Sequence, residues 1–570
     1  MTPRIAPRPA RIAVALLLTA LAPAAGAQSA DLAATTDKVF TAWNSTHTPG
    51  CAVGIAQGGQ VLLTRGYGMA DLAGARPILP GTILESGSVA KQFTATAIML
   101  LVNDGKLRLD DDARTVLPEL PVYGRTITFR HLLTHTSGLR EWSNLVAWQG
   151  WPRGTRVHTQ SDAFELITHQ QALNYPVGDY YSYTNSGFLL LRTVVERVSG
   201  MPFAQFTAQR IFGPLGMTNT QWRDDFTRVV PGLAQAYSRR ADGFHIDMPN
   251  DNVIAAGGLL TTVSDWLRWN DHLTKKTLGA GVIDSLTRRM KLTSGLEIAY
   301  ALGLTVNNYR GLREISHSGS TAGYGTYLAR YPEKNDLSIA VMCNVANAGA
   351  TGLTHAIVDA MVPGLPRAAV ADTIANDLAA VAKLVGIYRD TRTNTVVVLD
   401  TARGRLRRDG GAAFVALRGG GYQLGGSLVQ FTTDASGKPV TLRIPTSDGD
   451  TVVHAFTAAE RWKPTAAELA SIAGRYRNDE IGVTFTVGAA GDQLTISPRV
   501  GVTDTLTATY RDAFGDSEET VWFVRDKQGR GVGHALRQWT RLGRRIRAHE
   551  VAVSHQPCHM TARPLLLRPE

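Results

Sequence analysis

The chain has 570 residues, too many for one hydrophobic core, so we expect about two to four domains. Hydrophobic residues make up 44% and charged residues 19%, a globular composition that excludes a disordered, collagen-like or coiled-coil chain. The formal net charge is +11, but the basic residues are spread along the chain. The one cluster, at 541–547, alternates with apolar residues, so we expect no nucleic-acid partner.

The N-terminal segment predicts export. Three arginines precede the apolar run Ile12–Ala22, and Ala25-Gly26-Ala27 is typical of a signal-peptide cleavage site. We therefore expect residues 1–27 to be a secretory signal peptide and the mature protein to be periplasmic or secreted. The apolar run is too short for a stable anchor, so we expect no membrane span after cleavage, with an uncleaved anchor as the alternative.

Three cysteines, at positions 51, 343 and 558, are too few for a disulfide framework or a zinc knuckle. Cys51 and Cys343 both lie in expected strands, and export would permit one bridge. We expect them to act instead as small buried hydrophobic residues.

Residues 28–365 mix helix and strand signals. Alternating or apolar runs predict strands at 52–56, 61–64 and 337–342. Periodic stretches predict helices at 93–102, 189–198 and 265–273. The pattern predicts an α+β domain in which both ends of the segment form an antiparallel sheet, with a helical region between them.

The character of the sequence changes beyond Pro366. Residues 366–383 form an Ala-rich linker, and a repeat follows, in which 384–389 (Leu-Val-Gly-Ile-Tyr-Arg) matches 472–477 (Ile-Ala-Gly-Arg-Tyr-Arg). Short strand signals separated by Gly and Asp turns follow each copy. We therefore predict two small antiparallel β-barrels and a short tail, at 384–460, 465–550 and 551–570.

The first candidate for chemistry is Ser88-Val89-Ala90-Lys91, at the start of an expected helix. A serine there lies near the positive end of the helix dipole, and a lysine three residues later lies on the same face. The surroundings are apolar, so burial would favour a neutral amine able to accept the serine proton. The same spacing also occurs where a serine caps a helix and the lysine is exposed.

Two further motifs follow along the chain. In Tyr183-Thr184-Asn185, a phenol and an amide share one side of an extended segment, where they could relay a proton and hold a substrate carbonyl. In His317-Ser318-Gly319-Ser320, the Ser320 N–H could join the Ser88 N–H in an oxyanion hole. A histidine in a strand is more commonly structural, so this motif alone does not establish a site.

The order Ser-x-x-Lys, Tyr-x-Asn, His-x-Gly over residues 35–360 resembles the serine β-lactamase and penicillin-binding-protein superfamily. The segments 127–139 and 256–259 are also similar to that family. The resemblance implies Ser88 as nucleophile, Lys91 as base and Tyr183 as proton relay. It implies that the substrate contacts Asn185, His317, Gly319 and Ser320.

The third motif distinguishes members of this superfamily. Most β-lactamases and transpeptidases carry Lys-Thr-Gly there, whereas His-x-Gly resembles the D-aminopeptidases, D-stereospecific peptidases and some esterases. Two barrels after the catalytic domain are similar to the D-aminopeptidase architecture. In that family a long barrel loop presents an acid to the substrate amine, but the matching stretch here, 511–520, is short.

The resemblance therefore implies a secreted serine hydrolase, with D-residue peptides or amides as the leading substrate class. A carboxylesterase is the alternative, and a penicillin-binding or cell-wall sensor is the alternative of another class. We expect no cofactor; the partner is a small peptide, amide or ester substrate. His131 and His135 have the spacing of a zinc pair, but Leu132 replaces the expected glutamate, so we expect no metal and a structural role for both.

Overall fold

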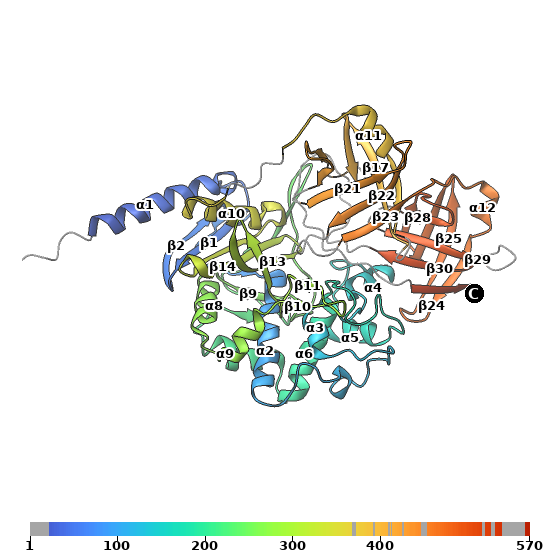
Figure 1. Ribbon diagram of the computed structural model, residues 1–570. Coiled ribbons are helices and arrows are strands. Elements are labelled where there is room, and N and C mark those ends of the chain that lie inside the picture. Colours follow the sequence, from blue (N-terminus) through green and yellow to red (C-terminus); the bar gives the residue numbers. More distant parts are fainter. Residues whose placement is uncertain are drawn as a thin grey trace, which may run out of the picture.

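The chain folds into three parts in the computed structural model (Figure 1). A domain of mixed helices and strands comes first, and two strand-rich units follow beside it. The structure describes residues 22–366, 372–390, 394–408, 411, 413–424, 427–445, 453–515, 519–525, 531–538 and 565–569. Most of the predicted signal peptide and the whole basic cluster at 541–547 lie outside these residues.

A six-stranded antiparallel sheet forms the centre of the first domain. Its strands, in spatial order, are β12 (Thr305–Tyr309), β13 (Leu312–Thr321), β14 (Tyr324–Tyr331), β15 (Leu337–Cys343), β1 (Cys51–Gln57) and β2 (Gln60–Tyr67). The pairing of β1 with β15 joins the two ends of the domain, as the sequence predicts. The predicted strands at 52–56, 61–64 and 337–342 are confirmed as parts of β1, β2 and β15.

Helices bury both faces of this sheet. On β15, Ile339 and Val341 join an apolar cluster under α10 (Ala350–Met361) and α1 (Ala22–Val39). Ala340 and Met342 point the other way, into the cluster that contains residues of α8 (Val263–Lys275). Since neighbouring side chains of a strand face opposite sides, a strand covered on both faces needs an unbroken apolar run.

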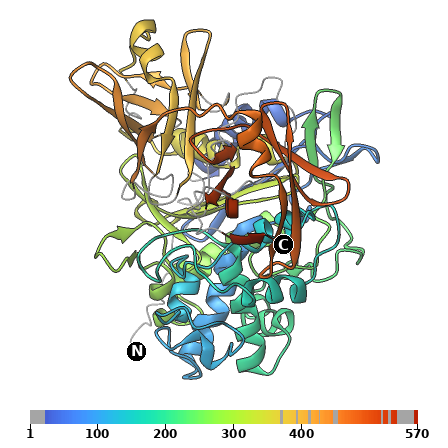
Figure 2. The same cartoon turned by 90° about the vertical axis from the view of Figure 1, so that its right-hand side faces the viewer.

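The helical region lies on the α8 side of the sheet; Figure 2 shows it below the two strand-rich units. Its helices are α2 (Lys91–Asn103), α3 (Phe129–Leu133), α4 (Trp142–Trp148), α5 (Gln160–Thr168), α6 (Asn185–Ser199), α7 (Phe203–Thr207) and α9 (Ala280–Leu286). The predicted helices at 93–102, 189–198 and 265–273 are confirmed within α2, α6 and α8.

Short strands complete the first domain. They are β3 (Met69–Asp71), β4 (Arg76–Pro77), β5 (Leu84–Glu85), β6 (Gln221–Trp222), β7 (Tyr237–Arg240), β8 (Gly243–Ile246), β9 (Leu259–Thr261), β10 (Met290–Lys291) and β11 (Glu297–Ile298). The three-stranded sheet β5-β9-β6 matters most for the site, because Ser88 follows β5 closely and the loop before β9 reaches Lys91.

The expectation of two unpaired cysteines needs correction. Cys51 and Cys343 are both fully buried, as expected, but they are joined by a disulfide bond. They are register partners on the adjacent antiparallel strands β1 and β15, which brings their side chains together on one face. Because the two cysteines are 292 residues apart in the sequence, their contact could not be predicted from local patterns.

Two eight-stranded antiparallel sheets make up the rest of the chain. The first contains β16 (Gly386–Arg389), β17 (Val396–Ala402), β18 (Arg405–Arg408), β19 (Val415–Ala416), β20 (Tyr422–Leu424), β21 (Ser427–Thr433), β22 (Pro439–Pro445) and β23 (Val453–Ala459). The second contains β24 (Gly474–Asn478), β25 (Val483–Ala490), β26 (Gln493–Arg499), β27 (Val502–Leu506), β28 (Ala513–Gly515), β29 (Glu519–Arg525), β30 (Gly531–Gln538) and β31 (Leu565–Pro569).

Both sheets curl into nearly closed barrels. An isolated bridge between Arg407 and Ala413 brings the edges of the first sheet together, and one between Ala508 and Phe514 does so in the second. The two copies of the sequence repeat form the same hydrogen bond. The Tyr388 hydroxyl donates to the Leu384 carbonyl and the Tyr476 hydroxyl to the Ile472 carbonyl, both at 2.8 Å.

Two boundaries differ from the sequence expectation. The helix α11 (Leu378–Leu384) begins inside the expected linker, and Val381 and Leu384 enter the core of the first barrel. At the other end, β31 lies inside the expected tail and pairs with β24 and β30. Both segments are short. The strand β31 pairs with β24 far away in the sequence, and α11 is recognised by its packing on β17 and β18, so local patterns did not reveal either element.

The barrels differ in how they join the first domain. The core of the first barrel is a separate apolar cluster around Tyr388, Phe414 and Phe456. The core of the second barrel is continuous with the large cluster of the first domain. Phe485 on β25 packs edge-on against Trp148 on α4, with ring centroids 6.0 Å apart.

The disulfide should contribute measurably to stability. The variant Cys51→Ala/Cys343→Ala should lose about 2–5 kcal/mol of the free energy of unfolding, because the bridge ties together the two ends of the sheet. Urea denaturation with and without a reductant measures this. The reductant should destabilise the wild type and leave the double variant unchanged; equal stability of both proteins without reductant would contradict the prediction.

Candidate active site

Ser88 lies on a short 3-10 helix, Gly87–Ala90, that runs directly into α2. Gly87 has a φ of +52°, and a Cβ at this position would lie 2.6 Å from the Ser320 nitrogen. Only glycine combines this backbone conformation with so close an approach. The segment that carries Ser88 is therefore packed backbone to backbone against β13.

Lys91 is completely buried, and its Nζ contacts three oxygens. The distances are 3.1 Å to Ser88 Oγ, 2.8 Å to Asn185 Oδ1 and 2.7 Å to the Ala256 carbonyl. The amide and carbonyl oxygens can only accept hydrogen bonds. When they take both protons of a neutral amine, the remaining lone pair faces the Ser88 hydroxyl.

Asn185, the first residue of α6, is held by Glu141. One Glu141 carboxylate oxygen accepts from the Asn185 backbone N–H at 2.6 Å and from the Thr184 hydroxyl at 3.0 Å. The other accepts from Asn185 Nδ2 at 3.1 Å. Because a carboxylate accepts only, Glu141 fixes the amide so that Oδ1 faces Lys91.

The Ala256 carbonyl lies on a loop with an unusual backbone. Ala255 has a φ of +85°, and its carbonyl accepts from the Thr94 hydroxyl of α2 at 2.8 Å. The Gly258 N–H donates to Glu85 at 3.1 Å, just ahead of the Ser88 segment. These bonds tie the loop to the element that carries Lys91, and so place the second lysine acceptor.

A buried ion network supports the same loop. Arg223 donates to the Glu85 carboxylate at 2.9 Å and to the Asp251 carbonyl at 2.6 Å, and Arg153 donates to the Asp251 carboxylate at 2.6 Å. Burial alone would raise the pKa of Asp251, but the guanidinium groups of Arg153 and Arg223 hold this pKa below its ordinary value. The loop is thus anchored by paired charges.

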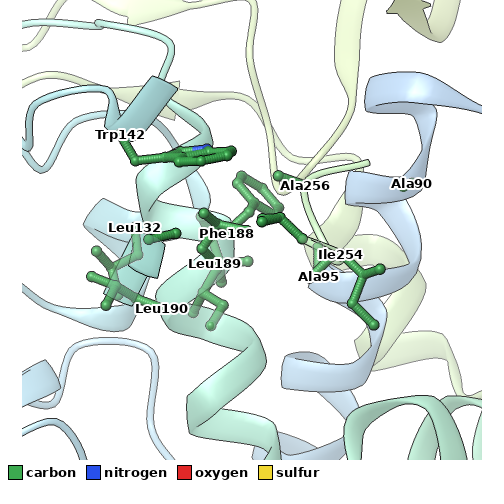
Figure 3. Close-up of a cluster of buried hydrophobic side chains, with 14 of the residues drawn as sticks. Ala90, Ala95, Leu132, Trp142, Phe188, Leu189, Leu190, Ile254 and Ala256 are labelled. Carbon is green, nitrogen blue, oxygen red and sulfur yellow. The ribbon is translucent and has the colours of Figure 1, made fainter. Parts of the chain in front are cut away.

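Tyr183 lies over the lysine, with its ring centre 4.8 Å from Lys91 Nζ. The Tyr183 ring also packs on the buried His135, with ring centroids 4.1 Å apart. Figure 3 shows Trp142 from α4, Phe188 from α6 and Ala256 from the loop meeting in the apolar cluster beside the site. The polar groups around Lys91 are therefore enclosed by apolar side chains.

His317 is bonded inside the protein through both ring nitrogens. Nδ1 donates to the Ser318 carbonyl at 2.6 Å, so in the neutral ring Nε2 accepts from the Tyr300 hydroxyl at 2.9 Å. The residue is 4% exposed. Burial is the main cause that lowers the pKa of His317 to about 3, and Lys91 adds to this effect when it is protonated. From the sequence we expected His317 to contact the substrate. In the structure both of its ring nitrogens bond to groups of the protein, the Tyr300 hydroxyl and the Ser318 carbonyl.

Gly319 and Ser320 lie on β13 beside the segment that carries Ser88. A Cβ at Gly319 would lie 2.1 Å from the Ser86 carbonyl, so glycine permits β13 to approach the nucleophile segment. The Thr326 hydroxyl of β14 donates to the same carbonyl at 2.7 Å. Ser320 is exposed beside Gly87, and its N–H remains our predicted partner of the Ser88 N–H in an oxyanion hole.

His131 and His135 have separate structural partners. His131 contacts the Thr128 N–H and hydroxyl in the cap of α3, and His135 Nδ1 accepts from the Thr184 N–H at 3.1 Å. In the part of the chain that the structure describes, no group of three or more His, Cys, Asp and Glu side chains could hold a metal ion. Among these residues, too, no helix has the length and apolar character to cross a membrane.

The stretch 511–520, which we compared from the sequence with the D-aminopeptidase loop, begins between the two barrels. The Tyr510 hydroxyl, just before this loop, donates to the Asn394 carbonyl of the first barrel at 2.9 Å. Tyr510 and Ala513 also pack against Ile387 and Val396 of the first barrel. The described start of the loop, 511–515, therefore belongs to the contact between barrels, while Asp516, Ser517 and Glu518 lie outside the described residues.

The sequence motifs did not identify Glu141, Tyr300 or the role of the Ala256 carbonyl. Glu141 follows closely on the segment 127–139, and Ala256 opens the second supporting segment, 256–259, so both were near recognised residues. Backbone carbonyls carry no residue-type signal at all. Tyr300 contacts His317 because the tertiary fold places the segment that carries Tyr300 next to β13.

The fold and the arrangement of Ser88, Lys91 and Asn185 define a serine hydrolase with an α+β catalytic domain. The profile of the Beta-lactamase family matches residues 32–361, more than half of the chain. The chain belongs to this family.

Relatives extend the likeness into the barrels. A D-aminopeptidase of Cereibacter sphaeroides is 28% identical over 318 residues, which are 54% of this chain and 60% of that enzyme, less than two thirds of its length. A D-aminopeptidase of Brucella ovis is 25% identical over 457 residues, 78% of this chain and 82% of that enzyme. The octameric penicillin-binding protein homologue from Pyrococcus abyssi has a similar fold, with a TM-score of 0.53, 18% identity and coverage of 83% of this chain and 98% of that chain.

The burial of His317 predicts a pH dependence of stability. In the unfolded chain a histidine takes up a proton near pH 6.5, whereas folded His317 stays neutral down to about pH 3. Since the unfolded state binds more protons between these values, the free energy of unfolding falls as the pH falls from 6.5 towards 3. At pH 5 this group should account for about 2 kcal/mol.

The variant His317→Gln removes this titration. Its free energy of unfolding, measured by urea denaturation, should fall less between pH 7 and pH 5 than that of the wild type. The exposed His169 supplies the control, because His169→Gln should keep the wild-type pH dependence. An unchanged pH dependence in His317→Gln would show that the ring is protonated in the folded state.

Proposed function

We propose that this serine hydrolase is an exported enzyme that releases D-amino acids from peptides or amides through an acyl-enzyme on Ser88. The observation that carries the proposal is the Lys91 amine, fully buried and held 3.1 Å from Ser88 Oγ by two oxygens that accept its protons. The D-aminopeptidase relatives and the His-x-Gly motif support the substrate class.

The reaction begins when the Ser88 oxygen attacks the substrate carbonyl carbon and its proton passes to neutral Lys91. The backbone N–H groups of Ser88 and Ser320 stabilise the oxyanion. The bond to the leaving amine then breaks, and the amine takes a proton relayed from Lys91 by Tyr183. A water molecule attacks the acyl carbon and gives a proton to Lys91. The ester bond to Ser88 then breaks, Ser88 Oγ takes this proton back from Lys91, and the acid is released.

A carboxylesterase is the second candidate, and the barrel loop favours it. An aminopeptidase needs an acid that pairs with the free amine of its substrate. The described start of the stretch compared with that loop packs between the barrels, through Tyr510 and Ala513. A short ester needs no such acid, so the same Ser88 chemistry would serve it.

The roles of Ser88 and Lys91 can be separated by substitution. Ser88→Ala should lower kcat on every substrate by about three orders of magnitude or more, with the circular dichroism spectrum unchanged. Lys91→Arg should keep less than about a tenth of the activity, because a guanidinium cannot act as a base at neutral pH. Labelling of the Ser88→Ala variant by a fluorophosphonate probe would place the nucleophile elsewhere.

The substrate class can be tested with a panel of D- and L-aminoacyl amides, short p-nitrophenyl esters and a chromogenic cephalosporin. D-aminoacyl amides should give the highest kcat/KM. The cephalosporin should be hydrolysed slowly, because neutral His317 offers no fixed charge to its carboxylate. Turnover of esters without turnover of amides would show that the protein is a carboxylesterase. Stable acylation by a penicillin without turnover would show that it is a sensor.

A further inference from the structure

The second barrel contacts the helical region immediately next to the residues that hold Lys91. The turn between β24 and β25 carries Glu480, whose carboxylate forms an ion pair with Arg140. Arg140 is 4% exposed, and it also donates to Gln170 Oε1 at 2.6 Å. A buried guanidinium depends strongly on its carboxylate partner, because desolvating an uncompensated charge is costly.

Arg140 is joined to the lysine acceptor from two sides. Its neighbour Glu141 accepts hydrogen bonds from the backbone and the side chain of Asn185. Its own carbonyl accepts from the hydroxyl of Ser186, the next residue of α6, at 2.6 Å. Any displacement of residue 140 therefore moves two supports of the residue whose Oδ1 lies 2.8 Å from Lys91 Nζ.

The same barrel also holds the far end of α4. Gln149 Nε2 donates to the Ile481 carbonyl at 2.9 Å, and Arg499 Nε donates to the Gly150 carbonyl at 2.9 Å. The Arg499 guanidinium lies 3.7 Å from the ring centre of Trp151. Phe485 packs on Trp148 at this same end of α4, so the second barrel contacts the chain on both sides of the helix, at Arg140 before it and at residues 148–151 at its end.

We propose that Glu480 of the second barrel is a positioning residue for the reaction, acting through Arg140 and Glu141 on the Asn185 acceptor of Lys91. This inference rests on the proposed role of Lys91 as base. In this proposal the second barrel affects the reaction although none of its groups contacts the substrate. Loss of the Glu480 carboxylate loosens the Asn185 amide, and the Lys91 lone pair is then less often directed at Ser88.

The test is the pH–rate profile of Glu480→Ala with the best substrate of the panel, at a temperature at which circular dichroism shows a folded protein. We expect kcat to fall about tenfold while KM changes less than about twofold. We also expect the acid limb of the profile to move to lower pH, because a fixed carbonyl acceptor favours the ammonium over the amine. Unchanged kcat and an unmoved profile would overturn the proposal, even if the melting temperature fell.

Two matched variants exclude a merely structural effect. Glu480→Gln keeps an oxygen acceptor for Arg140 but not the charge, so its kcat should lie between those of Glu480→Ala and the wild type. The adjacent Asp479 is exposed and pairs with Arg477 on the barrel surface, so Asp479→Asn should behave as wild type. Equal damage by Glu480→Gln and Glu480→Ala, or the same loss in Asp479→Asn, would overturn the proposal.

A double variant tests the route. If Glu480 acts through Glu141, the losses in kcat caused by Glu480→Ala and Glu141→Gln should combine to less than their product. If the two losses in kcat multiply in full, Glu480 does not act through Glu141. Lys91→Arg is assayed alongside these variants. Full activity of Lys91→Arg would show that Lys91 is not the base. An inactive Lys91→Arg together with a fully active Glu480→Ala would refute only the positioning role of Glu480.

Discussion

The site depends on burying a lysine amine away from bulk water. A completely buried ammonium is costly unless oxygens surround it, and the chain supplies three oxygens within 3.1 Å of Lys91 Nζ. They come from the turn before α2, from the start of α6 and from the loop before β9. The fold must bring three distant segments to one point, and much of its buried polar structure serves this requirement.

The sequence revealed the parts of this arrangement that are local. Ser88 and Lys91 are one helical turn apart, and Tyr183 and Asn185 belong to one short motif, so spacing was enough to pick them out. Their supports could not be read in this way. Glu141 contacts Asn185 across 44 residues, and the Ala256 carbonyl contacts Lys91 across 165 residues. Such contacts exist only once the tertiary fold has formed.

His317 illustrates a different limit. The motif placed it correctly in β13, but the direction of its side chain depends on Tyr300 and on the Ser318 carbonyl. The cysteines are similar, because their register on β1 and β15 decides whether they are thiols or a bridge. In both cases the sequence predicted the element, and the packing of neighbouring elements determined the chemistry.

The two barrels are copies that share a register, offset by 88 residues. Gly386 pairs with Leu399 in the first barrel as Gly474 pairs with Val487 in the second, and the tyrosine hydrogen bond is repeated. By this offset the position of Glu480 corresponds in sequence to Arg392. An arginine would repel the buried Arg140 rather than neutralise it. The charge at this position therefore favours the second barrel over the first beside α4, where the buried Arg140 guanidinium has a carboxylate partner.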